Sequence, residues 1–341
     1  MKWLFLMKFC GFMKIAVLGA GHLGRIHLDI IKSMSEYDLV GFYDPDTHLS
    51  RKISKEFSIR CFDSMSSLID ETDIVDIVTP TLSHFECAKQ AILNHKHVFI
   101  EKPVTNSVAE ADELIVLAEL NNVKVQVGHV ERFNPAFTAA KPYIKNPLFI
   151  ETHRLSPFNP RGTDVSVVLD LMIHDIDIIL NIVKSDITDI STSGVAVVSD
   201  NADISNARIE FENGCVANLT ASRVSLKKMR KARIFQKDAY VSIDFLEKKT
   251  EIVSLSEESP WNPFIMNIEV DTDGNKKSVH LHKPRVKKLN AIQEELVSFA
   301  KAIQNNSLPL VTLNDGCKAI RVAHTVMDKI NERITKTLSN V

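Results

Sequence analysis

The sequence predicts a two-domain α/β protein whose first domain holds a parallel sheet and whose second holds an antiparallel one. In the first 130 residues, short apolar runs alternate with helical patterns, and the runs have no polar face. Strands of that kind are covered by helices on both sides of a sheet. After about residue 147, segments alternate apolar and polar residues and contain turn signals such as Asn213-Gly214, which is typical of hairpins.

The first domain is predicted to span residues 13–133. Five apolar runs are expected as strands, and a helical pattern follows each of them. The runs are 14–19, 39–44, 73–80, 97–103 and 123–129, and the helical patterns begin at His22, Thr47, Leu82, Ser107 and Pro135. This alternation indicates a doubly wound sheet, in which ligands bind beyond the C-terminal ends of the strands.

The second domain is predicted to span residues 134–341 and to be built on a mostly antiparallel sheet. One long helix is expected first, then strands in hairpins, then two closing helices. The helix is placed at about 164–184, the strands within 207–224, 231–245 and 264–282 with a turn at 273–275, and the closing helices at 289–305 and 315–335. Because an exposed antiparallel sheet face often becomes an interface, a homo-oligomer is expected.

The composition argues against several classes of function. The chain has 41 Lys and Arg residues, 43 Asp and Glu residues and a net charge of −2, which gives no support for a nucleic-acid or membrane-surface partner. No segment is apolar for long enough to span a bilayer. The five cysteines are far apart, which favours reduced thiols and a cytoplasmic location. Residues 1–12 fit a signal peptide poorly, so Met13 is expected as the natural first residue.

A glycine motif follows the first strand and predicts a dinucleotide site. The stretch GAGHLG at 19–24 matches GxGxxG between an apolar run and a helical pattern, which is the context that makes the motif meaningful. Its first glycine permits a tight turn, its second lets the backbone approach a pyrophosphate, and its third lets the helix pack closely on the strand. The predicted cofactor contacts here are Gly19, Gly21, His22, Leu23 and Gly24.

Asp44 ends the second predicted strand, about 20 residues beyond the glycine motif. An acid there accepts hydrogen bonds from the adenosine ribose and repels a 2′-phosphate. No Arg follows it directly, so NAD is favoured over NADP. A helix-capping Asp in a turn is also compatible with the sequence.

Polar residues at the ends of three further strands are expected to converge on the same crevice. They lie in VTPTLSH (78–84), IEKPV (100–104) and VGHVERFNP (127–135). Lys102 follows Glu101 and precedes Pro103, which disfavours a helical conformation for the lysine. The lysine fits either a surface ion pair or a group that exchanges a proton with a substrate hydroxyl.

The stretch VVLDLMIHDIDIIL at 167–180 combines an apolar helix with four polar residues. At about 100° per residue, Asp170, His174 and Asp177 share one face, while Asp175 points elsewhere and needs a structural partner, either backbone or an Arg. A histidine oriented by a carboxylate suits proton removal from an alcohol. A salt-bridged structural helix is the alternative. No HExxH motif or Cys partner accompanies it, so no metal is expected.

Arginines near this helix suggest a phosphate-bearing substrate. A predicted loop at 153–165 holds Arg154 and Arg161, and Arg is suited to bidentate phosphate contacts. Arg132 and Asn134 open the helix that leaves the first domain and are expected to line the substrate cleft. Arg132 could equally pair with Glu131.

Five motifs, in this order, resemble the Gfo/Idh/MocA family. They are the glycine motif, Thr79-Pro80 with His84, Glu101-Lys102-Pro103, Arg132-Phe133-Asn134, and Asp170 with His174. The resemblance covers nearly the whole chain from Met13. It implies an NAD(P)-dependent sugar or cyclitol oxidoreductase with a Rossmann domain and a C-terminal α/β domain built on an open, mostly antiparallel sheet.

The resemblance also implies roles for individual residues. Lys102, Asp170 and His174 match the catalytic set, and the residue matching Asp177 touches substrate hydroxyls. Glu101 is expected near the nicotinamide ribose, and Thr79, Pro80 and His84 along the cofactor cleft. Whether Lys102 or His174 takes the proton stays open.

The stretches VGHVERFNPA, FIEKPV and 153–180 more narrowly resemble a branch of the family that oxidises the 3-hydroxyl of UDP-N-acetylglucosamine. The ketone product of that branch goes to a pyridoxal-phosphate aminotransferase, a possible pathway partner. The alternatives are a dehydrogenase of free sugars or inositol, and a non-catalytic NAD-sensing regulator of the same fold. A regulator would need none of Lys102, Asp170 and His174.

Overall fold

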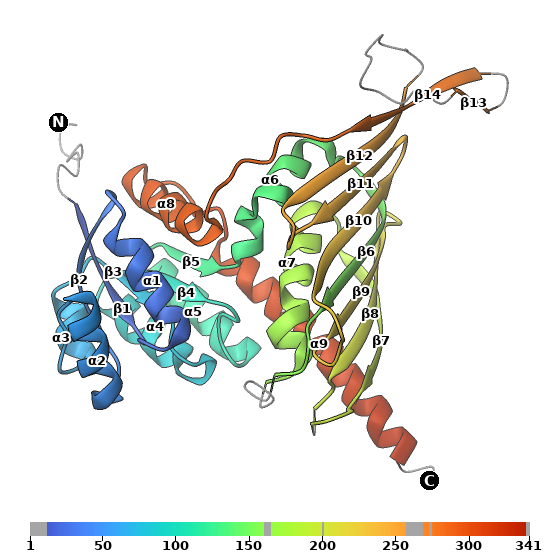
Figure 1. The fold of residues 1–341 in the computed structure, drawn as a ribbon. Coiled ribbons are helices and arrows are strands. Elements are labelled where there is room, and N and C mark those ends of the chain that lie inside the picture. The colour runs from blue at the N-terminus through green and yellow to red at the C-terminus, as the bar shows by residue number, and fades with distance from the viewer. Residues whose placement is uncertain (1–11, 160–164, 200, 257–268, 273–274, 339–341) are drawn as a thin grey trace. The chain divides into compact units, whose positions relative to one another are not determined.

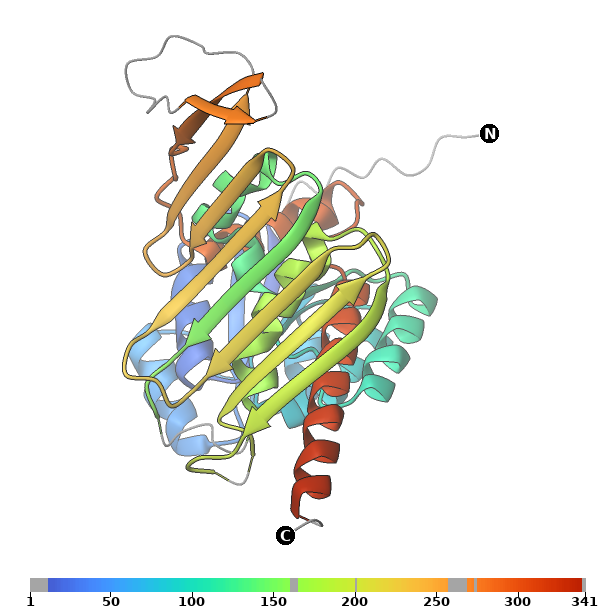
Figure 2. The same cartoon turned by 90° about the vertical axis from the view of Figure 1, so that its right-hand side faces the viewer.

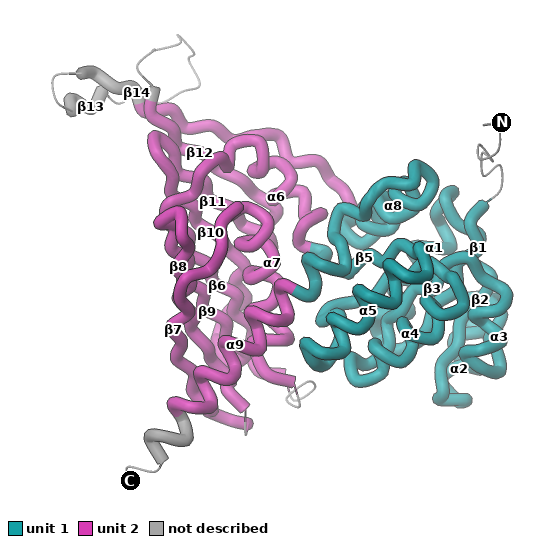
Figure 3. Tube along the Cα trace, turned by 180° about the vertical axis from the view of Figure 1, so that it is seen from behind, with its two compact units in different colours: residues 1–130, 290–317 teal, residues 131–289, 318–341 magenta. Residues whose placement is uncertain are grey.

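The computed structural model describes residues 12–159, 165–199, 201–256, 269–272 and 275–338. The chain forms two compact units (Figure 3). Unit 1 consists of Met1–Val130 and Asn290–Cys317, and unit 2 of Glu131–Leu289 and Lys318–Val341. The sequence predicted a single domain boundary at 133/134, close to the point after Val130 where the chain first passes from unit 1 to unit 2. It assigned all of 134–341 to the second domain, whereas Asn290–Cys317 belongs to unit 1.

Unit 1 is built on a parallel sheet of five described strands in the order β2-β1-β3-β4-β5. The strands are β1 (Met13–Leu18), β2 (Tyr37–Tyr43), β3 (Ile74–Ile77), β4 (His97–Glu101) and β5 (Val125–Gly128). The connecting helices are α1 (His22–Lys32), α2 (Thr47–Phe57), α3 (Met65–Asp70), α4 (His84–Leu93) and α5 (Val108–Leu120) (Figure 1). The predicted doubly wound sheet is confirmed. The strand order reverses at β1 and β3, where such folds bind ligands.

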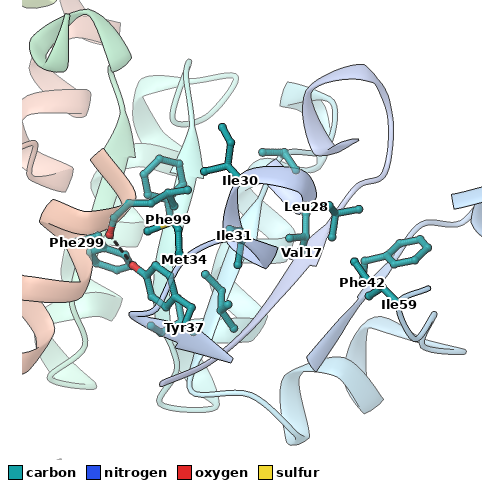
Figure 4. Packing of buried hydrophobic residues seen from close by; sticks show 14 of the residues in the cluster. Val17, Leu28, Ile30, Ile31, Met34, Tyr37, Phe42, Ile59, Phe99 and Phe299 are labelled. Carbon is teal, nitrogen blue, oxygen red and sulfur yellow. Dashed lines mark hydrogen bonds between the residues drawn. The ribbon is translucent and has the colours of Figure 1, made fainter. Parts of the chain in front are cut away.

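Helix α8 (Ala291–Gln304) belongs to unit 1, although it lies far from the other elements in sequence. Its Phe299 ring packs on Phe99 of β4 at 6.2 Å between ring centroids. The hydroxyl of Tyr37 donates a hydrogen bond of 2.7 Å to the carbonyl of Leu296 (Figure 4). The helix is amphipathic and buries Leu296, Phe299 and Ala300 in this core. That burial draws it into the first unit, against the sequence-based assignment.

Unit 2 is built on a sheet of nine described strands in the order β13-β14-β12-β11-β10-β6-β9-β8-β7. The strands are β6 (Pro147–Leu155), β7 (Ile187–Val195), β8 (Ile204–Phe211), β9 (Val216–Ser222), β10 (Met229–Gln236), β11 (Ala239–Asp244), β12 (Lys249–Ser256), β13 (Glu269–Thr272) and β14 (Asn275–His282). Only β6 and β9 pair in parallel among them. The predicted, mostly antiparallel sheet is confirmed. Part of the predicted segment 264–282, including most of its turn, lies outside the described residues.

Helices α6 (Pro135–Ala140) and α7 (Ile173–Ile182) lie on one face of this sheet (Figure 1), and Figure 2 shows the opposite face. The final helix, α9 (Leu313–Leu338), runs from unit 1 into unit 2. Among the described residues, no helix is both long and apolar enough to cross a membrane.

The segment predicted as one long helix at 164–184 has a different local geometry. A π-helical turn, Val168–Met172, precedes α7, and Ile182 ends the helix. A π-turn bonds residues five apart and therefore shifts the phase of the side chains relative to an ideal α-helix. It includes Asp170 and lies just before His174, so the side-chain directions predicted from 100° per residue do not hold across this turn. π-turns are frequent at functional sites.

Candidate active site

The glycine turn after β1 forms one wall of a cleft in unit 1. Gly19 has φ +96°, and a Cβ atom there would lie 2.8 Å from the Val78 carbonyl oxygen. A Cβ on Gly24 would lie 2.0 Å from the Gly19 carbonyl oxygen, whereas one on Gly21 would meet nothing within 4 Å. The first and third glycines are therefore required by close packing. Gly21 is the N-cap of α1 and offers no capping side chain, so this helix end suits a phosphate.

The cleft has a volume of about 710 Å³ and lies beyond the C-terminal ends of β1 and β3. Seven residues predicted to contact the cofactor line it: Gly19, Gly21, His22, Leu23, Asp44, Thr79 and Pro80. A glycine turn, an acid and a helix N-terminus on one cleft fit a dinucleotide. The shape of the unit-1 site thus agrees with the cofactor that the sequence motif indicates.

Asp44 holds the glycine turn from the end of β2. Its Oδ2 accepts the Ala20 N–H at 2.8 Å, and its Oδ1 accepts the Asp46 N–H at 2.9 Å. Capping of α2 falls to Asp46, which accepts from His48 and Leu49. Asp46, and not Asp44, therefore caps the helix with its side chain. Asp44 holds the glycine turn and lines the cleft.

His84 lies behind the cleft rather than on its wall. Its side chain is buried, with Nδ1 at 2.8 Å from the Pro103 carbonyl oxygen and Nε2 at 2.8 Å from the Thr79 carbonyl oxygen. The ring thereby connects the loop after β3 with the loop after β4. Burial lowers the pKa of His84, although the two carbonyl contacts oppose the shift. These contacts give His84 a structural role next to the loop that carries Lys102.

Glu101 and Lys102 stand at the end of β4. The Glu101 side chain is largely buried, and its Oε2 accepts the Lys102 backbone N–H at 3.1 Å. Lys102 is half-buried. The side chain of Glu101 therefore fixes the backbone of Lys102. The lysine lies at the C-terminal end of β4, where parallel sheets bind their ligands.

The three polar residues predicted to share one face of 167–180 differ in how far they are buried in unit 2. Asp170 is exposed, and His174 is half-buried. Asp177 is 1% exposed and is bound by Arg132, with Nε–Oδ2 at 2.8 Å and Nη2–Oδ1 at 2.6 Å. Bidentate pairing of this kind fixes both side chains. Asp177 is therefore a partner of Arg132, whereas the sequence suggested Glu131.

Arg154 lies in strand β6, so the predicted loop at 153–165 begins too early. The Arg154 side chain lies on the inward face of β6 and is only 2% exposed. Its Nη2 donates to Asp175 at 2.8 Å, and its Nη1 donates to Glu131 at 2.8 Å. Asp175 thus has the arginine partner that the sequence analysis expected for it. These contacts give Arg154 a structural role in place of the phosphate contact expected from the loop.

Two further predicted substrate contacts have distinct outcomes. Asn134 is the N-cap of α6: its Oδ1 accepts the Ala136 N–H, and its Nδ2 donates to Glu131 and to the Phe245 carbonyl. Arg161 lies outside the described residues. No group of three or more His, Cys, Asp or Glu residues that could hold a metal occurs in the described ranges.

A buried group of titratable residues in unit 1 was not predicted from the sequence. It consists of His27 on α1, Asp76 on β3 and Glu295 on α8, together with Glu101. Asp76 in the otherwise apolar run IVDIV (74–78) was an available signal, because a central strand rarely buries an acid without a partner. Its partner, His27, could not be identified from the sequence.

Comparisons with known proteins agree with the class of protein that this fold and cleft define, an NAD-binding oxidoreductase. A model described as "Oxidoreductase family, NAD-binding Rossmann fold" matches residues 13–129, and the GFO/IDH/MocA C-terminal domain matches residues 128–241. The chain therefore belongs to the Gfo/Idh/MocA family, as the sequence motifs predicted. Its cofactor is a nicotinamide dinucleotide.

Two relatives indicate the range of substrates in the family. UDP-N-acetylglucosamine 3-dehydrogenase from Acidithiobacillus ferrooxidans is 39% identical over 245 residues, which is 70% of this chain and 76% of that protein. A solved structure of that enzyme has a TM-score of 0.84 at 33% identity and covers 94% of this chain and 98% of its own. A scyllo-inositol 2-dehydrogenase (NAD(+)) from Bacillus subtilis is 30% identical over 232 residues, 62% of this chain and 68% of that protein.

Proposed function

We propose that the protein is an NAD-dependent dehydrogenase that oxidises the 3-hydroxyl of a UDP-N-acetyl-hexosamine. The observation that carries the proposal is the unit-1 cleft, whose glycine turn and Asp44 fit the dinucleotide. Lys102 directly follows β4 of the same sheet, at the C-terminal end of that strand. The substrate is taken from the relative that is 39% identical, which is named for that reaction. When bound, the nicotinamide supplies the hydride acceptor.

The chain's own residues manage the proton. In this proposal Lys102 and His174 contact the reacting oxygen, and one of them takes the hydroxyl proton while Asp170 orients His174. His suits this role because its ordinary pKa lies near neutrality. Arg161, outside the described residues, is proposed for the pyrophosphate of the nucleotide-sugar, which guanidinium groups bind well.

The substrate assignment is tested by NADH formation at 340 nm. We expect a signal with UDP-N-acetylglucosamine or its galacto epimer, and none with glucose or free N-acetylglucosamine. Myo- and scyllo-inositol belong in the panel because of the inositol dehydrogenase relative. Turnover of inositol without turnover of the UDP-sugar would contradict the substrate. No turnover of any alcohol despite tight NADH binding would favour the non-catalytic regulator instead.

Lys102→Ala tests the role of the lysine. We expect kcat to fall about a thousandfold while NADH affinity stays within a few-fold, because only the reacting oxygen loses a contact. Lys89→Ala is the matched control, since Lys89 pairs with Glu113 on the surface of the same unit. Unchanged turnover of Lys102→Ala would rule out the role.

The preference for NAD over NADP is assigned to Asp44. Arg51 and Lys55 line a neighbouring hollow of about 530 Å³ that Asp44 also borders. On this partly basic surface, the carboxylate of Asp44 is the group that would repel the 2′-phosphate of NADP. Asp44→Asn keeps an oxygen acceptor for the Ala20 N–H and removes the charge. We expect the NAD-to-NADP ratio of kcat/KM to fall at least tenfold, and an unchanged ratio would leave Asp44 with only its role in the turn.

We further propose that the protein is a homo-oligomer assembled through the open face of the unit-2 sheet. Phe149, Phe235 and Tyr240 form a chain of ring contacts there, and Phe235 is 39% exposed. Light scattering should give a mass above 38.3 kDa, and Phe235→Arg should lower it. A monomer in both cases would contradict the assembly. An aminotransferase that consumes the ketone is proposed as the pathway partner, tested by coupled formation of the amino-sugar.

A further inference from the structure

Four titratable side chains meet in the interior of unit 1, and we call them the His27 cluster: His27, Asp76, Glu101 and Glu295. They come from α1, β3, β4 and α8, and each residue is at most 7% exposed. The helices α1 and α8 pack against each other within unit 1. Because burying an ion costs several kcal/mol unless partners compensate it, such a cluster requires an explanation beyond packing.

His27 lies between two carboxylates. Its Nδ1 is 2.8 Å from Asp76 Oδ2, and its Nε2 is 3.4 Å from Glu101 Oε1. The Phe99 ring, 5.8 Å away, packs against the imidazole. Burial lowers the pKa of His27, but Asp76 and Glu101 together raise it well above its ordinary value. The ring is therefore an imidazolium that hydrogen-bonds Asp76 through Nδ1 and forms an ion pair with Glu101, while its Nε2 makes no hydrogen bond within the described residues.

Glu295 completes the cluster as a neutral acid. It is fully buried, and neither of its carboxyl oxygens has a hydrogen-bond partner. Burial, with Glu101 and Asp76 nearby, raises its pKa well above the ordinary value. Burial also raises the pKa of Asp76, although His27 opposes this shift. Tyr37, whose pKa is raised by burial and by Asp76, is a further titratable group close to the cluster.

Glu101 connects this interior cluster to the proposed catalytic lysine. One of its oxygens faces His27, and the other accepts the Lys102 backbone N–H. Gly128, at the end of β5, leaves room for the carboxylate, because a Cβ there would lie 2.9 Å from Glu101 Oε1. The position of this carboxylate therefore sets the backbone on which Lys102 stands.

We propose that His27 is a positioning residue whose ion pair with Glu101 holds that carboxylate in place against the Lys102 backbone N–H. A contact inside the sheet then determines where the Lys102 side chain can reach. The inference rests on the proposed function, in which Lys102 contacts the reacting oxygen. A merely structural His27 would support the fold without affecting the contact between Glu101 and the Lys102 N–H.

His27→Gln is the decisive variant because glutamine keeps a hydrogen-bond donor and loses the charge. Without the cation, Glu101 loses its ion-pair partner, so its bond to the Lys102 N–H weakens. We expect kcat at pH 7 to fall about tenfold, with KM and NADH affinity within threefold. A kcat equal to that of the wild type would overturn the proposal.

Tyr37→Phe is the matched control, since it removes a buried hydrogen bond to Leu296 in the same core and leaves the His27–Glu101 contact in place. It should lower the unfolding temperature and leave kcat within about twofold of the wild type. An equal loss of kcat in both variants would assign the effect to general loosening of the core and would overturn the proposal.

A measurement without turnover separates this inference from the proposed function. In protein labelled with ¹⁵N-lysine, the Lys102 amide signal should move in His27→Gln and keep its wild-type position in Tyr37→Phe. In ¹³C-histidine-labelled protein, the His27 ring should remain protonated between pH 6 and 8.5. An unchanged Lys102 signal in His27→Gln, or a neutral His27 at pH 7, would overturn the proposal even if the dehydrogenase activity is confirmed. Should the wild type oxidise no sugar while these signals appear, the proposed function alone fails.

Discussion

The His27 cluster of unit 1 and the Arg154 network of unit 2 (Arg154 with Glu131 and Asp175) compensate buried acids in different ways. Both are almost fully buried, and in both the acids outnumber the cations. Arg154 makes contacts of 2.8–3.2 Å to both of its carboxylates, because a guanidinium offers five N–H groups in a fixed fork. An imidazolium offers two. An excess of acid therefore gives a fixed network in unit 2 and, where the excess is larger, a cluster that retains a proton in unit 1.

The largest expected effect comes from removing the cation of the unit-2 network. Arg154→Met leaves Glu131 and Asp175 buried without their guanidinium, so we expect a loss of about 3–5 kcal/mol in the free energy of unfolding. Guanidinium denaturation measures it. A second change, Asp175→Leu in the same chain, should recover part of the loss. A loss below about 1 kcal/mol would show that water or Arg230, 3.7 Å from Glu131, replaces the arginine.

Glu295→Gln tests the extra proton of the unit-1 cluster. Because the folded pKa of Glu295 is raised, the folded state binds a proton that the unfolded state releases above about pH 4.3. Wild-type stability should therefore fall as the pH rises, by at most about 1.4 kcal/mol per pH unit. The variant lacks this dependence and should gain on the wild type between pH 6 and 8. Parallel stability curves would mean that Glu295 is ionised in the folded protein.

Asp203 of unit 2 is the opposite case, a buried acid that stays ionised. Burial opposes ionisation, but backbone N–H groups of Val197, Val198 and Ser199 hold its pKa at about 2. The depressed pKa contributes stability above about pH 4, which is lost as the pH falls towards 2. Asp203→Asn should cost about 1–2 kcal/mol at pH 7 and clearly less at pH 2. An equal cost at both pH values would assign the effect to the altered hydrogen bonds alone.

The smallest effect is expected at the exposed pair of Arg60 and Glu71. Its two contacts are as short as the buried ones, 2.6 and 2.9 Å, but both side chains are about half exposed. Water screens the pair, so Arg60→Gln should leave the denaturation midpoint unchanged within error. A clear shift would mean that contact geometry matters more than burial, against the comparison of the two units.

Much of the fold was predictable because its signals are local. The apolar runs without a polar face predicted β1 to β5, and the glycine motif predicted the turn that Gly19 and Gly24 form. The alternating segments predicted the antiparallel sheet of unit 2. The motif residues at the ends of β1 and β3 were also predicted to line the cleft, since parallel strands end at the same edge of a sheet.

The sequence by itself determined the family, the two kinds of sheet and the cofactor turn, because periodicity and short motifs act over a few residues. Only the tertiary structure decided the partners of the buried charges. Arg132 meets Asp177 across 45 residues, and Gln126 reaches the Glu295 backbone across 169. It likewise placed α8 in unit 1 and the π-turn beside His174. Such pairings depend on how whole elements pack, and desolvation then gives each buried acid its protonation state.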